Sequence, residues 1–190
     1  MMYSFRIEQA IRAATVLHKN QMRKGRAPYP YVAHSFSVAC ISADYTQDED
    51  VIIASLLHDT LESTDYTADE LENDFGKHVR TMVESISESK EQDSSAWLLQ
   101  KEIYLEKIAR AEDDALLVLA AESIHNMRSI IEEYQATTRD YLADFHGTLE
   151  DRLVFYQKMS TLFNRTLKNG IVHEFNHVFD EYKKFLTYGS

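Results

Sequence analysis

The feature that most constrains this chain is an apolar run that ends abruptly in ionisable side chains. Residues 52–57 (Ile-Ile-Ala-Ser-Leu-Leu) hold five apolar residues in six, which predicts a helix buried on nearly every side. The run leads directly into His58 and Asp59, and Glu62 follows four residues after His58, a spacing that puts both on one helical face. An imidazole beside carboxylates suits a divalent ion such as Mn²⁺, Fe²⁺ or Zn²⁺. The alternative is a helix whose polar end simply meets solvent.

A second apolar run repeats this pattern later in the chain. Residues 115–121 (Ala-Leu-Leu-Val-Leu-Ala-Ala) are all apolar and lead into Glu122, His125 and Asn126. Glu122 and Asn126 are four residues apart and therefore share a helical face, with His125 beside them. Elsewhere apolar residues recur mostly at spacings of three and four, and 5 Gly and 2 Pro are too few for many short strands. We therefore expect an all-α fold in a single domain, residues 1–190.

The charge balance limits the partners of the protein. A formal net charge of −11 opposes broad binding to nucleic acid or to an anionic membrane, because like charges repel. No run reaches the ~18 apolar residues needed to span a bilayer, and the N-terminus lacks the apolar core of a signal peptide, so we expect a cytoplasmic protein with no membrane partner. The sole cysteine, Cys40, lies in an apolar run and is expected to fill the core.

A phosphorylated ligand of such an acidic protein must meet a local cluster of cations. The segment 22–31 holds both prolines and is predicted to be a loop. It also carries Arg23, Lys24 and Arg26, which are candidates for an anion clamp, with a solvated turn as the alternative. His34 follows directly, at the start of the next predicted helix.

Helix-start signals and polar segments place the remaining elements. Capping boxes are predicted at Thr46, which would start the helix of the first apolar run, and at Thr67. The polar segment 87–95 is the best candidate for a mobile loop that could gate a site. Two further helices are expected within residues 138–188, with a break near Gly170.

The last predicted helix contains a sequence that matches a zinc-peptidase motif but lacks the context of one. His173-Glu174-Phe175-Asn176-His177 matches the zinc-peptidase pattern H-E-x-x-H. Catalytic zinc needs three protein ligands, however, and only thirteen residues follow His177 to supply the third. The chain also shows no strand signal for a substrate-binding sheet edge. We therefore interpret these histidines as ordinary residues on a solvated helix face.

Four ionisable residues remain, and each lies where an apolar segment turns polar. They are His34, His58, Asp59 and Glu122, on three predicted helices. This order of a single His, a His-Asp pair and a distant acidic residue resembles the HD-domain metal-dependent phosphohydrolases. Over about residues 5–135 the flanking motifs are further similar to those of the small Rel/Spo-type alarmone hydrolases.

Several motifs carry this resemblance in the same order as in the family, which is more specific than any one of them alone. In the P-Y-x-x-H motif we align Pro28-Tyr29 with the Pro-Tyr pair, which treats Pro30 or Tyr31 as an insertion before the His. The segments are 18–24 (H-x-x-Q-x-R-K), Pro28-Tyr29 with His34 (P-Y-x-x-H), 56–62 (L-L-H-D-T-x-E), Phe75-Gly76, the spacing of Trp97, Lys101 and Tyr104, and 121–127 (A-D-K-x-x-N-L/M).

The resemblance implies a compact HD-domain helical bundle, to which the two C-terminal helices are additions. It implies a metal-dependent phosphohydrolase that removes the 3′-pyrophosphate of guanosine tetra- or pentaphosphate, usually with Mn²⁺. It also implies that His34, His58, Asp59 and Glu122 bind the metal. The expected partner is a small phosphorylated nucleotide.

The chemistry of further residues fits such a reaction. Asp59 and Glu62 are the candidate catalytic residues, and Glu62 can orient or deprotonate the attacking water. Arg23 can bind a pyrophosphate with its planar guanidinium fork, and Lys24 can bind it as a point charge. Asn126 is placed to hold the nucleotide sugar or the water.

Two positions depart from the family pattern. Glu122 stands where the family has Asp and is one methylene longer, and Ser63 stands where the family has a second acidic residue after the His-Asp motif. These departures leave two alternatives open: an HD-type phosphohydrolase that acts on another nucleotide or phosphate ester, and a nucleotide-binding protein that has lost catalysis. The sequence does not define the oligomeric state.

Overall fold

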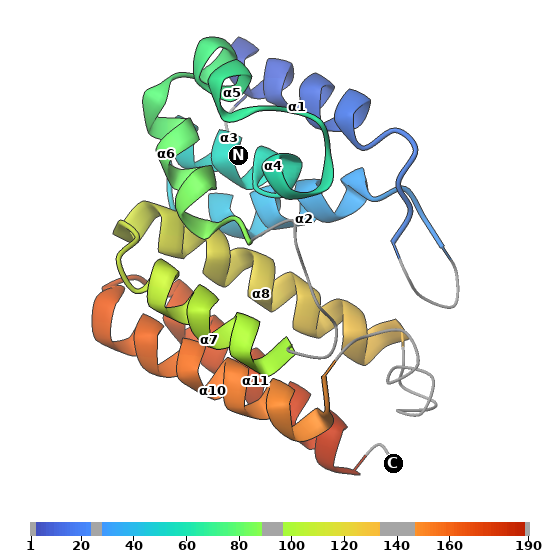
Figure 1. Ribbon diagram of the computed structural model, residues 1–190, viewed down its shortest axis with the longest axis vertical. Coiled ribbons are helices and arrows are strands. Elements are labelled where there is room, and N and C mark those ends of the chain that lie inside the picture. The colour runs from blue at the N-terminus through green and yellow to red at the C-terminus, as the bar shows by residue number, and fades with distance from the viewer. Residues whose placement is uncertain (1–2, 24–27, 89–96, 134–146, 189–190) are drawn as a thin grey trace.

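The computed structural model describes residues 3–23, 28–88, 97–133 and 147–188 (Figure 1). Within these ranges the chain forms helices and no strand, apart from one isolated β-bridge between Met22 and Pro30, so the all-α prediction is confirmed. The helices are α1 (Phe5–Leu17), α2 (Val32–Ala43), α3 (Glu49–Leu57), α4 (Thr60–Ser63), α5 (Ala68–Phe75), α6 (Lys77–Ile86), α7 (Trp97–Ile108), α8 (Asp113–Glu133), α10 (Leu149–Thr166) and α11 (Ile171–Tyr188).

The long helix α8 lies between two groups of helices (Figure 1). It packs against α2, α3 and α6 on one side and against α11 on the other, which explains why every residue of 115–121 is buried. Helix α3 is enclosed in the same way by α1, α2, α6 and α8, and all of its residues in 51–57 are buried. The two apolar runs of the sequence therefore form adjacent central helices, and their polar ends are brought close together.

The helix expected through Glu62 is interrupted. Helix α3 ends at Leu57, and the short helix α4 begins at Thr60. The Thr60 hydroxyl donates to the Leu57 carbonyl (2.6 Å), which satisfies one of the free carbonyls at the end of α3. His58 and Asp59 thus occupy the junction of two helices, where adjacent side chains can point into one space.

The start of α3 corrects one predicted capping box and leaves the other intact. Asp48, not Thr46, is the N-cap of α3, and its side chain accepts from the backbone N–H of Asp50 (2.8 Å). Aspartate caps a helix at least as well as threonine, so the helix begins two residues later than predicted. The Thr46 hydroxyl lies outside the helix and accepts from the Asp48 N–H (3.0 Å). At Thr67 both hydrogen bonds of the capping box are present, as predicted.

Other sequence predictions meet mixed outcomes. Cys40 is exposed rather than buried, because α2 turns its neighbours Val38 and Ala39 toward the core. The C-terminal helix pair is confirmed as α10 and α11, although residues 138–146 lie outside the described part of the chain. The same holds for the predicted mobile loop 87–95, of which only the first two residues are described.

The H-E-x-x-H sequence on α11 lies on a helix face with exposed histidines, as expected. His173 and His177 are exposed, whereas Glu174 accepts a hydrogen bond from the Tyr45 hydroxyl and pairs with Arg128 (2.7 Å). Glu174 therefore ties α11 to α8 and to the end of α2.

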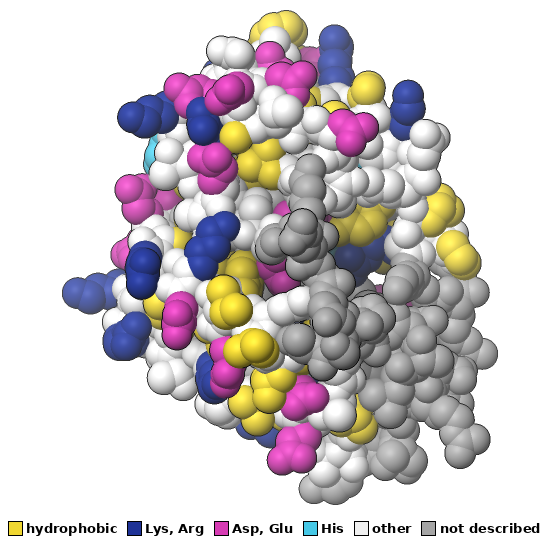
Figure 2. All heavy atoms as spheres, in the orientation of Figure 1, with side chains coloured by type: hydrophobic (Ala, Val, Ile, Leu, Met, Phe, Trp, Pro, Cys, Tyr) yellow, Lys and Arg dark blue, Asp and Glu magenta, His cyan; other side chains and the backbone are white. Residues whose placement is uncertain are grey.

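The surface carries charges of both signs. Figure 2 shows acidic and basic side chains interspersed on one face, with hydrophobic side chains gathered over α7, where Leu99 and Ile103 are 58% and 61% exposed. In the part of the chain that the structure describes, no helix combines the length and the apolar character needed to cross a membrane.

We predict that the C-terminal helices unfold together with the rest of the chain as one domain. Phe175 of α11 is fully buried, and its ring meets Phe163 of α10 edge-on, with 4.9 Å between centroids. Replacing Phe175 with Ala should lower the free energy of unfolding by about 3–5 kcal/mol through the cavity it leaves. Denaturant unfolding followed by circular dichroism should show a single shifted transition. Phe5→Ala, at an exposed position of α1, is the control with little effect, and two separate transitions would contradict the single domain.

Candidate metal centre

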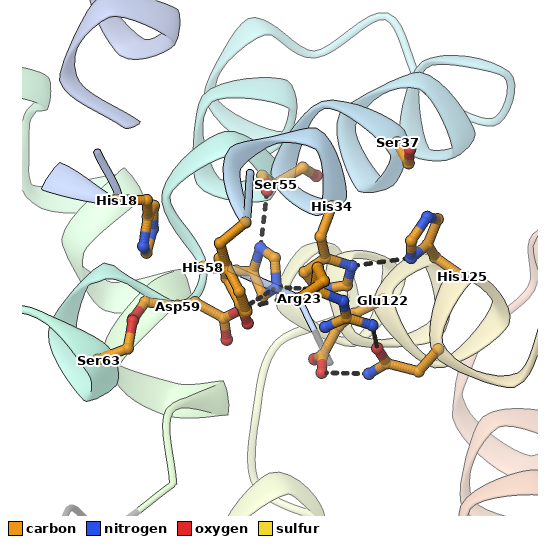
Figure 3. A network of polar contacts seen from close by, with 12 residues as sticks. His18, Arg23, His34, Ser37, Ser55, His58, Asp59, Ser63, Glu122 and His125 are labelled. Carbon is orange, nitrogen blue, oxygen red and sulfur yellow. Dashed lines mark hydrogen bonds and ion pairs between the residues drawn. The ribbon is translucent and has the colours of Figure 1, made fainter. Parts of the chain in front are cut away.

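Three side chains converge where α2 meets the α3–α4 junction (Figure 3). One ligand atom each from His34, His58 and Asp59 lies within 4.8 Å of the others. The Nε2 atoms of His34 and His58 are 3.2 Å apart, and Asp59 Oδ2 lies 3.1 Å from His58 Nε2 and 3.7 Å from His34 Nε2. Both histidines are almost completely buried. The structure therefore brings together three of the four predicted metal ligands.

The chemistry and spacing of this group fit a divalent ion. His58 Nδ1 donates to the backbone carbonyl of Ser55 (2.8 Å), so the lone pair of neutral His58 is on Nε2 and faces the group. Two ligand atoms that are each about 2.1 Å from one ion, as in Zn²⁺–histidine bonds, lie about 3 Å apart when they subtend a right angle. The observed separations of 3.1 and 3.2 Å match this arrangement. Two imidazoles and a carboxylate suit Mn²⁺, Fe²⁺ or Zn²⁺.

The charges in the group attract a cation. Burial favours neutral His58, but the carboxylates of Asp59 and Glu122 outweigh it and raise the pKa of His58 to about 9. Burial, followed by the charges of His58 and Arg23, lowers the pKa of His34 well below its ordinary value. Burial also opposes ionisation of Asp59, yet the charge and hydrogen bond of His58 hold the pKa of this carboxyl far below its usual range. A divalent ion bound here would displace the His58 proton.

The fourth predicted ligand, Glu122, lies beside this group but not within it. Its Oε1 accepts from the Asn126 amide (3.0 Å), and Asn126 Oδ1 accepts in turn from Arg23 Nη2 (3.0 Å). Burial raises the pKa of Glu122 to about 7, against the opposing charge of His58. The structure thus joins three predicted site residues in one chain of hydrogen bonds next to the group (Figure 3). Direct coordination by Glu122 stays a prediction.

The predicted general base, Glu62, is held in place by a residue that is not part of the His34, His58 and Asp59 group. Its Oε1 accepts from the backbone N–H of Glu88, whose own carboxylate pairs with Lys101 of α7. Burial, together with the charge of Asp59, raises the pKa of Glu62 to about 8. The neighbouring Ser63 turns its hydroxyl back to the Asp59 carbonyl (2.7 Å). Lys24, the other predicted pyrophosphate ligand, lies outside the described residues.

Sequence reasoning missed Tyr31. Its hydroxyl donates to Asp59 Oδ2, its ring meets the ring of His34 edge-on, and the guanidinium of Arg23 lies 5.5 Å from its centroid. Backbone hydrogen bonds of 2.9 Å, from Tyr31 N to Gln21 O and from Arg23 N to Tyr29 O, fold the segment back on itself and place both side chains at the site.

The alignment that treated Pro30 or Tyr31 as an insertion was therefore wrong. Residues 30–34 read Pro-Tyr-Val-Ala-His, which satisfies P-Y-x-x-H without any insertion. This signal was present in the sequence, where the earlier Pro28-Tyr29 pair competed for the same motif, and the contact of Tyr31 with Asp59 supports the later pair.

Three further contacts were not predicted. His125 Nδ1 lies 2.8 Å from His34 Nδ1, and burial, with the charges of Arg23 and His58, lowers the pKa of His125 to about 4. Gln21 links the end of α1 to α4, because it contacts His18 Nδ1 (2.8 Å) and donates to the Ser63 carbonyl (2.6 Å).

With this geometry established, comparison with known proteins identifies the class. The family model "HD domain" matches residues 10–146, and the chain belongs to the HD domain family. Among curated relatives, it is 35% identical over 156 residues to a GTP pyrophosphokinase of Myxococcus xanthus, covering 77% of this chain and 20% of that protein. It is also 35% identical over 115 residues to the human guanosine-3′,5′-bis(diphosphate) 3′-pyrophosphohydrolase MESH1, covering 60% of this chain and 63% of that protein. The chain thus spans less than two thirds of the length of each relative.

A solved structure supports the fold. It is described as a metazoan ortholog of SpoT that hydrolyzes ppGpp and plays a role in starvation responses, and it matches with a TM-score of 0.77. The match covers 95% of this chain and 97% of that chain at 24% sequence identity. The fold shared with this structure therefore extends into α10 and α11, beyond the residues that the family model matches.

We predict that Tyr31→Phe weakens divalent-metal binding by about 10–100-fold, because it removes the hydrogen bond that orients Asp59. Competition with a chelating dye for Mn²⁺ measures this affinity. Tyr66→Phe is the matched control, since the Tyr66 hydroxyl also donates to a carboxylate, that of Asp74 (2.7 Å), but does so on α5. Equal Mn²⁺ affinity in the Tyr31 variant and the unchanged protein would show that this hydrogen bond does not support the site.

Proposed function

We propose that the protein is a metal-dependent phosphohydrolase that removes the 3′-pyrophosphate of guanosine tetra- or pentaphosphate. The observation that carries this proposal is the group of buried His34 and His58 with the partly buried Asp59. It lies next to an arginine, Arg23, whose fork can bind a pyrophosphate. Human MESH1 is named as a 3′-pyrophosphohydrolase of this substrate and the metazoan SpoT ortholog is described as hydrolyzing ppGpp, and both support the choice. The partner is then a small nucleotide, whose phosphates would meet Arg23 locally, since the net charge of −11 opposes broad binding to polyanions. The expected cytoplasmic location stays a prediction.

The metal that we propose is Mn²⁺, held by His34, His58 and Asp59, with Glu122 as the additional ligand predicted from the sequence. A divalent ion supplies Lewis acidity, which polarises a phosphoryl oxygen and lowers the pKa of water. The bound cation would also lower the pKa of the nearby Glu62, which burial and the charge of Asp59 raise to about 8. Glu62 is then ionised near neutral pH and is able to act as a base.

The residues of the chain act on both partners of the reaction. Glu62 takes a proton from the attacking water, whose oxygen bonds to the phosphorus next to the ribose, while the bond from that phosphorus to the 3′ oxygen breaks. The 3′ oxygen takes a proton from solvent and Glu62 returns the one it accepted to solvent, so the products are guanosine diphosphate or triphosphate and pyrophosphate. Arg23 turns its fork from Asn126 to the pyrophosphate, which frees Asn126 Oδ1 to accept a hydrogen bond from the sugar. Lys24 adds a point charge.

A second candidate is HD-type hydrolysis of another nucleotide or phosphate ester. Ser63 supports it, because its hydroxyl donates to the Asp59 carbonyl and the residue offers no carboxylate next to Glu62. Glu122 supports it as well, since its longer side chain is engaged by Asn126. A nucleotide-binding protein without catalysis is the remaining alternative.

Product analysis with guanosine tetraphosphate and Mn²⁺ tests the proposal directly. The unchanged protein should release guanosine diphosphate and pyrophosphate, and the double variant His58→Ala/Asp59→Ala should release neither. No turnover by a protein that binds Mn²⁺ would exclude this substrate. Turnover of nucleoside monophosphates alone would favour the second candidate, and tight nucleotide binding without any turnover would favour the third.

We predict that Glu62→Gln lowers kcat by about 10²–10⁴-fold while the Mn²⁺ affinity stays close to that of the unchanged protein, because an amide keeps the hydrogen bond to Glu88 but cannot accept a proton. Steady-state kinetics and chelator competition give the two quantities. Glu106→Gln, at an exposed position of α7, is the control. An unaltered kcat would remove Glu62 from the reaction.

A further inference from the structure

His34 is the one ligand of the group whose second ring nitrogen meets a side chain. His34 Nδ1 lies 2.8 Å from Nδ1 of His125 on α8, and the two ring centroids are 4.8 Å apart (Figure 3). For His58 the corresponding partner is a backbone carbonyl, that of Ser55. His34 is only 1% exposed, so its Nδ1 depends on the protein for a hydrogen bond.

The protonation of this pair decides whether His34 can bind a cation. A neutral imidazole carries its proton on one nitrogen and a lone pair on the other. If His34 donates from Nδ1 to His125, its Nε2 lone pair faces His58 and Asp59. If His125 donates instead, the proton of His34 moves to Nε2 and points at His58 Nε2, 3.2 Å away, which blocks coordination.

We propose that His125 is a positioning residue that accepts the hydrogen bond from His34 Nδ1 and so holds the His34 tautomer that can bind metal. This inference rests on the metal site of the proposed function. Metal-bound histidines generally donate their other N–H to a fixed acceptor, and losing that acceptor weakens metal binding.

The surroundings of His125 hold its ring in place. The Ser129 hydroxyl, one turn further along α8, lies 2.8 Å from the His125 carbonyl and 3.2 Å from His125 Nδ1, and its single proton is donated to one or the other. Helices α2 and α8 pack along each other, so the two imidazoles come from rigid elements. The family motif A-D-K-x-x-N leaves this position open, which explains why the motif alone does not single out His125.

A matched pair of variants separates hydrogen bonding from shape. Leu and Asn have similar size, but the Asn Oδ1 can take the place of His125 Nδ1 as acceptor. His125→Leu should raise the dissociation constant for Mn²⁺, measured by chelator competition, about 10–100-fold. His125→Asn should recover most of this loss. His177→Leu, an exposed histidine on α11, should leave the constant unchanged, and thermal unfolding by circular dichroism checks that each variant folds.

A second readout needs no variant. Histidine ¹⁵N NMR of the unchanged protein loaded with diamagnetic Zn²⁺ should show His34 protonated at Nδ1, and a proton on Nε2 would overturn the proposal. Unaltered Mn²⁺ affinity in His125→Leu would overturn it while the metal site stands. Equal losses in the Leu and Asn variants would also overturn it, because shape alone would then matter. If the unchanged protein binds no divalent metal, the proposed function fails together with it.

Discussion

The structure depends on the burial of two apolar helices against each other. Helices α3 and α8 are enclosed by their neighbours. The hydrophobic effect that drives this burial also removes the polar residues at their ends from water. Ionisable groups in such a place require compensation. The group of His34, His58 and Asp59 supplies part of it internally, through a charged imidazole next to a carboxylate, and a divalent ion is the stronger form of the same compensation.

Each member of the group is oriented by a different kind of partner. His58 donates to a main-chain carbonyl, Asp59 accepts from the Tyr31 hydroxyl, and His34 meets the imidazole of His125. The first partner is independent of side-chain identity, whereas the other two are open to substitution. The selectivity and affinity of an HD site can therefore differ between relatives that share the same ligands.

The two positions that depart from the family pattern, Ser63 and Glu122, make different contacts in the structure. Ser63 turns its hydroxyl to the backbone and offers no carboxylate beside Glu62, which is held by the Glu88 N–H. Glu122 keeps its carboxylate near the group but directs it to Asn126 and, through it, to Arg23. The longer side chain thus couples the metal site to the residues proposed to bind substrate.

The sequence by itself determined the helical class, the HD family resemblance and the candidates His34, His58, Asp59 and Glu62, because apolar periodicity and ordered motifs are local properties of the chain. Only the tertiary structure decided that α3 breaks before Thr60, that Asp48 rather than Thr46 caps it, and that Tyr31 and His125 complete the site. These outcomes depend on competition between equivalent local choices and on contacts between segments distant in sequence, such as His34 with His125. Local pattern cannot rank such choices, since their free energies are set by the packing of α1, α2 and α8 around the site.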